Sequence, residues 1–183
     1  MLYRSSGIRD RLGFGPKLTA LFMGSWHGPN IEAVQWLSDN ISGNESFQIL
    51  LIGSVCEHPS FKTLPSNIIK LGLLPEYEKT AIMRAVDIAL NPIISGSGTN
   101  LKVLEYVSAG VPVLSTSFGN RGFPFIHGES ILIAELEQFK IELLEMSRKI
   151  DTHFLNIIAK NAYGHIANFD WQKIAHSLTI KIS

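Results

Sequence analysis

Apolar and polar residues alternate along the chain in blocks, and the blocks predict strands and helices in turn. Six short runs are almost wholly apolar, which is typical of strands buried on both faces. These runs occupy residues 18–24, 47–53, 67–74, 86–92, 111–116 and 131–134. Between and after them, apolar residues recur at helical spacing. The predicted helices cover 29–42, 76–85, 101–109, two stretches that begin at Glu135 and near Asp151, and, by position, 172–182.

This alternation predicts an α/β fold. Strands separated by helices at such spacing pair in parallel through right-handed crossovers. The result is a Rossmann-like, doubly wound parallel sheet of about six strands flanked by helices, with strand order 3-2-1-4-5-6. A chain of 183 residues has room for one full core. We expect residues 1–17, which are basic and contain glycine and proline, to form a solvated lead-in or linker, and residues 18–183 to form the domain.

Composition narrows the classes of function. The chain carries 16 Lys and Arg against 16 Asp and Glu, so no overall field favours nucleic acid or an anionic membrane. The one cysteine, Cys56, cannot form an internal disulfide or a multi-cysteine zinc site and indicates a reducing compartment. No apolar run reaches the roughly 18 residues of a membrane span, and the opening residues do not resemble a signal peptide. We expect a cytoplasmic chain with no transmembrane segment and no nucleic-acid partner.

The topology predicts where a ligand would bind. In a doubly wound sheet the crevice lies beyond the carboxyl ends of the strands, where the winding reverses. Here the reversal falls between the first and fourth strands, so the loops over residues 24–30 and 91–100 should meet there. Both loops contain glycine, and Gly96 and Gly98 allow the backbone to approach a ligand closely. Topology and composition thus select the same two loops.

The second loop leads into a helix whose start is a candidate anion site. If the helix begins near Thr99, the N–H groups of Thr99, Asn100 and Leu101, together with the helix dipole, suit a diphosphate. The alternative is an ordinary strand-to-helix turn with Thr99 or Ser97 as the N-cap. The loop residues alone leave both interpretations open.

Two charged residues follow on the same helix. Lys102 opposes the helix dipole in the first turn, and no acid lies between Asp87 and Glu105 to offset it. A bound anion would supply its partner, and the alternative is a lysine that extends into water. Glu105 lies one turn further on, where a carboxylate can accept hydrogen bonds from the two hydroxyls of a ribose. Most helical glutamates, however, are solvated surface residues.

Two other nucleotide-binding classes fit the sequence less well. A dinucleotide-dependent oxidoreductase needs G-x-G-x-x-G after the first strand, whereas GSGTNL follows the fourth and lacks the third glycine. A P-loop NTPase needs G-x-x-x-x-G-K-[ST], which the sequence does not contain. Both classes are disfavoured.

Three strings carry a resemblance to a known family. LFMGSWHGPNIEAVQWL, VDIALNPIISGSGTNLKVLEYVSAGVPVLSTSFGNRGF and NFDWQKIA resemble the carboxyl-terminal, nucleotide-sugar-binding domain of GT-B fold glycosyltransferases of the retaining family 4, or group 1, type. The resemblance covers the chain from about Leu18 to Leu178. Its most specific part is the glycine-rich loop with Lys102, Glu105 and the following SAGVPVLST.

The resemblance implies roles for individual residues. Glu105 matches the second glutamate of the family's E-x7-E motif, which holds the donor ribose. The other matched positions are Gly98, Thr99 and Asn100 at the diphosphate, with Lys102 beside them, Gly24 and Ser25 in the first glycine loop, and Ile69 to Leu71 at the base. These enzymes need no metal, so the resemblance implies a nucleotide diphosphate sugar as donor and no cofactor.

The sequence departs from the family pattern at this site. Ser97 stands where the first glutamate of the motif would lie, so the usual carboxylate contact to the donor sugar is missing or replaced. The loop GSWHGPN lacks the arginine and lysine that many members direct at the diphosphate, and His27 and Asn30 are the candidate substitutes. In this fold the group nearest the acceptor hydroxyl comes from an amino-terminal domain, which the residues before 18 are too few to build.

These features predict the donor-binding domain of a retaining glycosyltransferase of polysaccharide biosynthesis. It would move a hexose from a UDP-, GDP- or other nucleotide sugar to a glycan or lipid-linked acceptor, and would be inactive without an amino-terminal domain in cis or trans. That domain would hold the catalytic residues, pack on the carboxyl-terminal helix from about residue 170, and place the protein peripherally at the membrane. The alternative is a non-catalytic Rossmann-like module for protein association, with these exposed contacts: Trp171, Ile174, Leu178 and Ile180.

Overall fold

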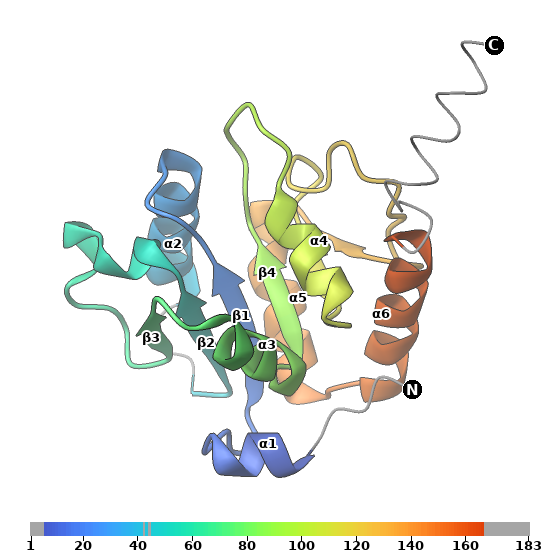
Figure 1. Ribbon diagram of the computed structural model, residues 1–183, viewed down its shortest axis with the longest axis horizontal. Helices are drawn as coiled ribbons and strands as arrows, with labels where there is room; N and C mark the ends of the chain where they lie inside the picture. The colour runs from blue at the N-terminus through green and yellow to red at the C-terminus, as the bar shows by residue number, and fades with distance from the viewer. Residues whose placement is uncertain (1–5, 42, 44, 167–183) are drawn as a thin grey trace.

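Parallel strands form one sheet in the order β3-β2-β1-β4-β5-β6 in the computed structural model, which describes residues 6–41, 43 and 45–166 (Figure 1). The strands are β1 (Leu18–Met23), β2 (Phe47–Ile52), β3 (Ile68–Gly72), β4 (Ile88–Asn91), β5 (Val113–Ser115) and β6 (Leu132–Ile133). The helices are α1 (Ser6–Arg11), α2 (Gly28–Ile41), α3 (Glu76–Ala85), α4 (Leu101–Ser108), α5 (Leu136–Arg148) and α6 (Thr152–Ile166), with short 3₁₀ helices η1 (Ser54–Glu57) and η2 (Pro59–Phe61). The predicted α/β fold, strand order and parallel pairing are confirmed.

Helices cover both faces of the sheet (Figure 1). The side chains of β1 alternate between the two faces. Ala20 and Phe22 pack in one apolar cluster with α2 and α5, whereas Leu21 and Met23 pack in a second cluster with α3 and α4. Every residue of β1 is buried, as its continuous apolar run predicts for a central parallel strand.

Part of the predicted lead-in is helical. Helix α1 lies at the amino-terminal edge of the sheet, where the guanidinium of Arg9 donates to the carboxylate of Asp87 and to the carbonyl of Ala85, both at 2.9 Å. Asp87 also accepts the backbone N–H of Thr19 in β1 at 2.8 Å. The expectation of solvated charge is therefore wrong for Arg9, because its charge is paired with a carboxylate just before β4.

Helix α4 begins where the predicted stretch 101–109 begins, and not near Thr99 as the candidate anion site assumes. Its first residue is Leu101, and its N-cap, Asn100, makes no capping hydrogen bond through its side chain. The N–H of Leu101 donates to the carbonyl of Thr99 at 2.9 Å, so it is already engaged, contrary to the prediction. The predicted N-caps, Thr99 and Ser97, are wrong as well. At its other end the helix stops as predicted, before Gly110 with φ +76°.

The last predicted helix, 172–182, lies outside the described residues. So do the apolar residues Trp171, Ile174, Leu178 and Ile180, and the association module that they suggest stays a prediction. Among the helices of the described part of the chain, none is long and apolar enough to cross a membrane.

The carboxyl ends of β1 and β2 meet in a backbone contact between Gly24 and Gly53. Hydrogen bonds continue past the strands, because Gly24 N–H donates to the carbonyl of Ile52 at 2.9 Å and Val55 N–H donates to that of Gly24 at 3.2 Å. Gly53 has φ +106°, in the left-handed region, and a Cβ on it would lie 2.2 Å from the Gly24 oxygen. Glycine at this position therefore lets the two loops approach at the edge of the sheet.

Gly53→Ala should lower the free energy of unfolding by about 3 kcal/mol or more, because the added Cβ collides with a backbone oxygen at a positive φ. Urea unfolding of the purified chain measures the change. Gly28→Ala is the matched control, since a Cβ at Gly28 meets no atom within 4 Å and its φ is not positive. The control should change the free energy by less than about 1 kcal/mol. Equal stability of the two variants would contradict the close approach.

Candidate functional site

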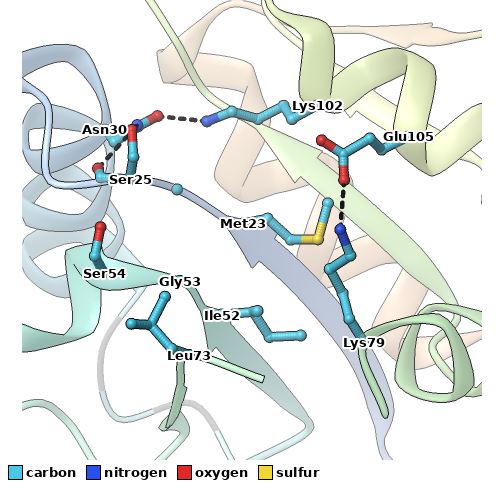
Figure 2. A pocket seen from close by; sticks show the side chains of 11 residues that line it. Met23, Ser25, Asn30, Ile52, Gly53, Ser54, Leu73, Lys79, Lys102 and Glu105 are labelled. Carbon is cyan, nitrogen blue, oxygen red and sulfur yellow. Dashed lines mark hydrogen bonds and ion pairs between the residues drawn. The ribbon is translucent and has the colours of Figure 1, made fainter. Parts of the chain in front are cut away.

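A cavity of about 340 Å³ opens at the carboxyl-terminal edge of the sheet. Its walls come from the loop after β1, from the segments that follow β2 and β3, and from α3 and α4 (Figure 2). The lining residues are Met23, Gly24, Ser25, Asn30, Ile52, Gly53, Ser54, Leu73, Lys79, Lys102 and Glu105. The volume is typical of a small-molecule site, and the position is that of the ligand crevice of a doubly wound sheet.

The loop after β1 is held in shape by Asn30. Its side-chain Nδ2 donates to the carbonyl of Ser25 at 3.0 Å. A Cβ on Gly24 would lie 3.0 Å from the Asn30 side chain, so glycine lets the loop turn tightly against the start of α2. The N–H of Trp26 donates to Oγ of Ser54 at 2.9 Å and joins this loop to the one after β2. The predicted residues Gly24, Ser25 and Asn30 are thus brought together in the lining.

Lys102 extends from α4 toward this loop (Figure 2). Its ammonium donates a hydrogen bond to Oδ1 of Asn30 and lies 4.3 Å from the centroid of the Phe22 ring. No carboxylate of the described residues forms an ion pair with it. Burial lowers the pKa of Lys102 from 10.5 to about 7, against a smaller opposing effect of the Glu105 charge. The alternative of a lysine extended into water is therefore wrong.

Glu105 is held at the cavity by Lys79 of α3. Nζ of Lys79 lies 2.9 Å from Oε2 of Glu105 and 2.9 Å from Oε2 of Glu76, and hydrogen bonds to Glu76 and then Glu105 raise the pKa of Lys79. Figure 2 shows the second oxygen of Glu105 turned toward the other lining residues, with no marked contact. The Glu105 side chain is half-exposed, so this oxygen is accessible to a ligand.

Tyr106 fixes the position of α4 over the sheet. Its ring is fully buried, and its phenol oxygen accepts the backbone N–H of Met23 at 2.7 Å, at the end of β1. Burial raises the pKa of Tyr106, so the phenol stays neutral. Residues three and four apart share one face of a helix, so Lys102, Glu105 and Tyr106 all face this end of the sheet. The buried tyrosine thereby sets the distance from both charges to β1.

The glycine-rich loop after β4 stands beside the cavity and does not line it. Figure 1 shows it extending beyond the sheet between β4 and α4. It does meet the first loop, as the topology predicts, because a Cβ on Gly96 would lie 3.0 Å from the ring of Pro29 in α2. The predicted site residues that lie outside the lining are Ser97, Gly98, Thr99 and Asn100. The loop is linked to the cavity through α4, which follows it and carries Lys102.

Two other predicted residues also lie outside the lining. The side chain of His27 is exposed and does not line the cavity, and its backbone carbonyl accepts the N–H of Asn30 at 2.9 Å, so His27 lies directly before the first residue of α2. Leu71 is half-buried and packs against the apolar cluster of α3 and α4. Leu73, two residues further on, lines the cavity instead and is 68% exposed.

Sequence reasoning missed several lining residues. They include Gly53, Ser54, Leu73 and Lys79. A signal for Gly53 was present, because the strings FMG and LIG end two neighbouring strands in the same way. Nothing comparable marks Lys79, which reaches Glu105 only because α3 and α4 pack on the same face of the sheet.

The arrangement offers two kinds of recognition. Lys102 presents a half-buried ammonium to an anion, and Glu105 presents a carboxylate oxygen to hydroxyl groups. Among the described residues, no group of three or more His, Cys, Asp or Glu side chains is placed to hold a metal ion. The cavity therefore suits a ligand that carries both negative charge and hydroxyl groups.

The fold and the cavity define a Rossmann-like α/β domain with its crevice where the winding reverses. The chain belongs to the group 1 glycosyl transferases, since the model of that family matches residues 17–148, well over half of its length. The resemblance seen in the sequence is thus confirmed.

Solved structures support the same fold. HepE from Anabaena, in complex with UDP and glucose, is 17% identical with a TM-score of 0.68, over 96% of this chain and 52% of that chain. The C-terminal domain of LpcC, a group 1 family protein from Francisella tularensis, is 17% identical with a TM-score of 0.65, over 91% of this chain and 92% of that chain. The match to an isolated C-terminal domain agrees with the half of a GT-B fold that the sequence predicts.

A curated relative extends the comparison. An uncharacterized 44.6 kDa protein in the cps region of Klebsiella pneumoniae is 34% identical over 115 residues, which are 61% of this chain and 29% of that protein. The chain therefore spans about half the length of HepE. Less than a third of the Klebsiella protein is aligned with it.

Lys102→Met should change how stability depends on pH. The pKa of Lys102 is about 7 in the folded protein against its ordinary value of 10.5. Above about pH 7 the unfolded chain thus holds one more proton, and stability rises with pH by up to about 1.4 kcal/mol per unit. Urea unfolding at about pH 7 and about pH 9 should show the unmutated chain gaining stability relative to Lys102→Met.

Lys79→Met is the matched control for this measurement. The pKa of Lys79 is raised above 10.5, so Lys79 is protonated in both states over this range and its removal adds no slope. The same pH slope in the unmutated chain and in Lys102→Met would contradict the burial of a titrating ammonium.

Proposed function

We propose that this chain is the donor-binding domain of a retaining glycosyltransferase and binds a nucleotide diphosphate sugar in the cavity. One observation carries the proposal: a half-buried ammonium, Lys102, shares the cavity with the carboxylate of Glu105 and, within the described residues, has no carboxylate in contact. A diphosphate would supply the missing counter-ion. The UDP bound by HepE, a relative in fold, supports the choice of a nucleotide.

The diphosphate would lie between Lys102 and the loop before α4. The N–H groups of Ser97, Thr99 and Asn100 make no hydrogen bond within the described part of the chain, so they are available to phosphate oxygens. An anion beside Lys102 raises the pKa of its ammonium and keeps it protonated. Lysine and amides would then stabilise the charge that develops on the departing diphosphate, with no metal ion.

The nucleoside would lie on the other side of the cavity. The free oxygen of Glu105 would accept a hydrogen bond from a ribose hydroxyl, as the family resemblance implies. The base would lie along the segment after β3, where Leu73 offers an exposed apolar side chain and residues 69–71 offer backbone groups. Gly24 and Ser25 would lie beside the phosphates and the sugar.

The acceptor would be bound by a second domain. The chain spans about half of HepE, so a domain of similar size is the natural source of the missing half, in cis or in trans. We place in it the acceptor site, for a glycan or lipid-linked sugar, and the group nearest the acceptor hydroxyl. Peripheral contact with a membrane would also belong to that domain.

Nucleotide titration tests donor binding. UDP, GDP, ADP and CDP are titrated into the purified chain by calorimetry, and at least one should bind. Glu105→Gln should weaken the best binder about tenfold or more, because it replaces a charged acceptor of ribose hydroxyls by a neutral one. The loss should be smaller for the 2′-deoxynucleotide.

Glu145→Gln is the matched control for Glu105→Gln, since Glu145 is exposed on α5 and does not line the cavity. It should leave the affinity within about twofold. If none of the four nucleotides binds, the donor site is refuted.

Sugar transfer tests the incompleteness of the site. The chain alone, given a nucleotide sugar and a glycan acceptor, should bind the donor yet transfer little or no sugar, because the acceptor side is not provided. Release of labelled product is measured by chromatography. Robust transfer by the chain alone would show that the acceptor site lies within these residues.

A further inference from the structure

Arg121 holds the glycine-rich loop from outside the cavity. Its Nη2 donates to the backbone carbonyls of Gly96 at 2.8 Å and of Gly98 at 2.5 Å. The arginine lies after β5, more than twenty residues further along the chain. One guanidinium nitrogen therefore joins two alternate peptide units of the loop.

The guanidinium is itself fixed in place. It stacks on the ring of Phe118, with 3.8 Å between Arg121 Cζ and the ring centroid, and its Nη1 donates to the carbonyl of Phe118 at 3.1 Å. A third bond joins the same two segments, because Nδ2 of Asn100 donates to the carbonyl of Gly119 at 3.1 Å. The loop is thus held by a rigid group rather than by a flexible side chain.

These contacts decide which way the loop amides point. In a planar trans peptide the C=O and the N–H point in opposite directions, and no peptide of the described residues is cis. The carbonyl of Gly96 shares its peptide with the N–H of Ser97, and the carbonyl of Gly98 shares its peptide with that of Thr99. Because both carbonyls face Arg121, both N–H groups point away from it, on one side of the loop.

We propose that Arg121 is a positioning residue that presents the Ser97 and Thr99 N–H groups together to the donor diphosphate. The inference rests on the proposed function, since it concerns the same ligand. Neither N–H makes a hydrogen bond within the described residues, which leaves two parallel donors oriented before the ligand arrives. Preorganised donors bind an anion without the cost of ordering the loop.

The test compares Arg121→Gln with the unmutated chain against three ligands: UDP, GDP and uridine. Arg121→Gln should weaken UDP or GDP binding about fivefold or more and leave uridine binding, followed by NMR titration, within about twofold. Backbone ¹⁵N order parameters measured without ligand should fall at residues 96–100 only. If Arg121 served only to stabilise the fold, Arg121→Gln would not weaken diphosphate binding more than uridine binding.

Two further variants complete the design. Phe118→Leu removes the stacking ring and retains the charge of Arg121, so it should also weaken diphosphate binding. It provides the test if Arg121→Gln fails to fold. Arg148→Gln is the matched control, because Arg148 is an exposed arginine at the end of α5 and should change nothing.

The outcomes are distinguishable. If the unmutated chain binds UDP or GDP and Arg121→Gln binds it equally well, the inference is overturned and the proposed function stands. Lost affinity with unchanged order parameters in residues 96–100 shows that Arg121 touches the phosphates directly, and also overturns the inference. If the unmutated chain binds neither UDP nor GDP, this inference falls, and failure of all four nucleotides refutes the donor site.

Discussion

The backbone contact between Gly24 and Gly53 determines the form of the site. Two central strands end together there, and a side chain on Gly53 would separate the loops that follow them. With the loops close, the N–H of Trp26 reaches Ser54, and Asn30 of the first loop lies within reach of Lys102. The backbone conformation that only glycine allows at Gly53 thus helps to position Lys102, some fifty residues later in the chain.

Lys102 lies between its charged and neutral forms near pH 7 before a ligand is present, because its pKa is about 7. An ammonium partly withdrawn from water without a partner is costly, and here the cost is reduced by the amide oxygen of Asn30 and the face of the Phe22 ring. Both partners are weaker than a carboxylate, so the group remains able to gain from an arriving anion. Tyr106 keeps the helix that carries it fixed to β1.

Much of the fold follows from patterns that the sequence displays directly. Strands buried on both faces leave continuous apolar runs, and α3 has the predicted bounds, 76–85. The N-cap of α4 could not be predicted, because glycine, serine and threonine suit a loop and a first helical turn equally well. The pairing of Lys79 with Glu105, and the side of the loop that faces Arg121, depend on contacts between distant segments that leave no local signal.

The ion pair between Lys79 and Glu105 has a consequence for recognition. One oxygen of Glu105 is already occupied by an ammonium, and the other is open. A ligand that offers a single hydroxyl can bind at the open oxygen without disturbing the pair, whereas a vicinal diol that uses both oxygens must share one of them with the Lys79 ammonium. Helix α3 therefore orients the carboxylate and weakens one of its two acceptor oxygens, so substitution of Lys79 would change the relative affinity for one-hydroxyl and two-hydroxyl ligands while leaving the phosphate contacts intact.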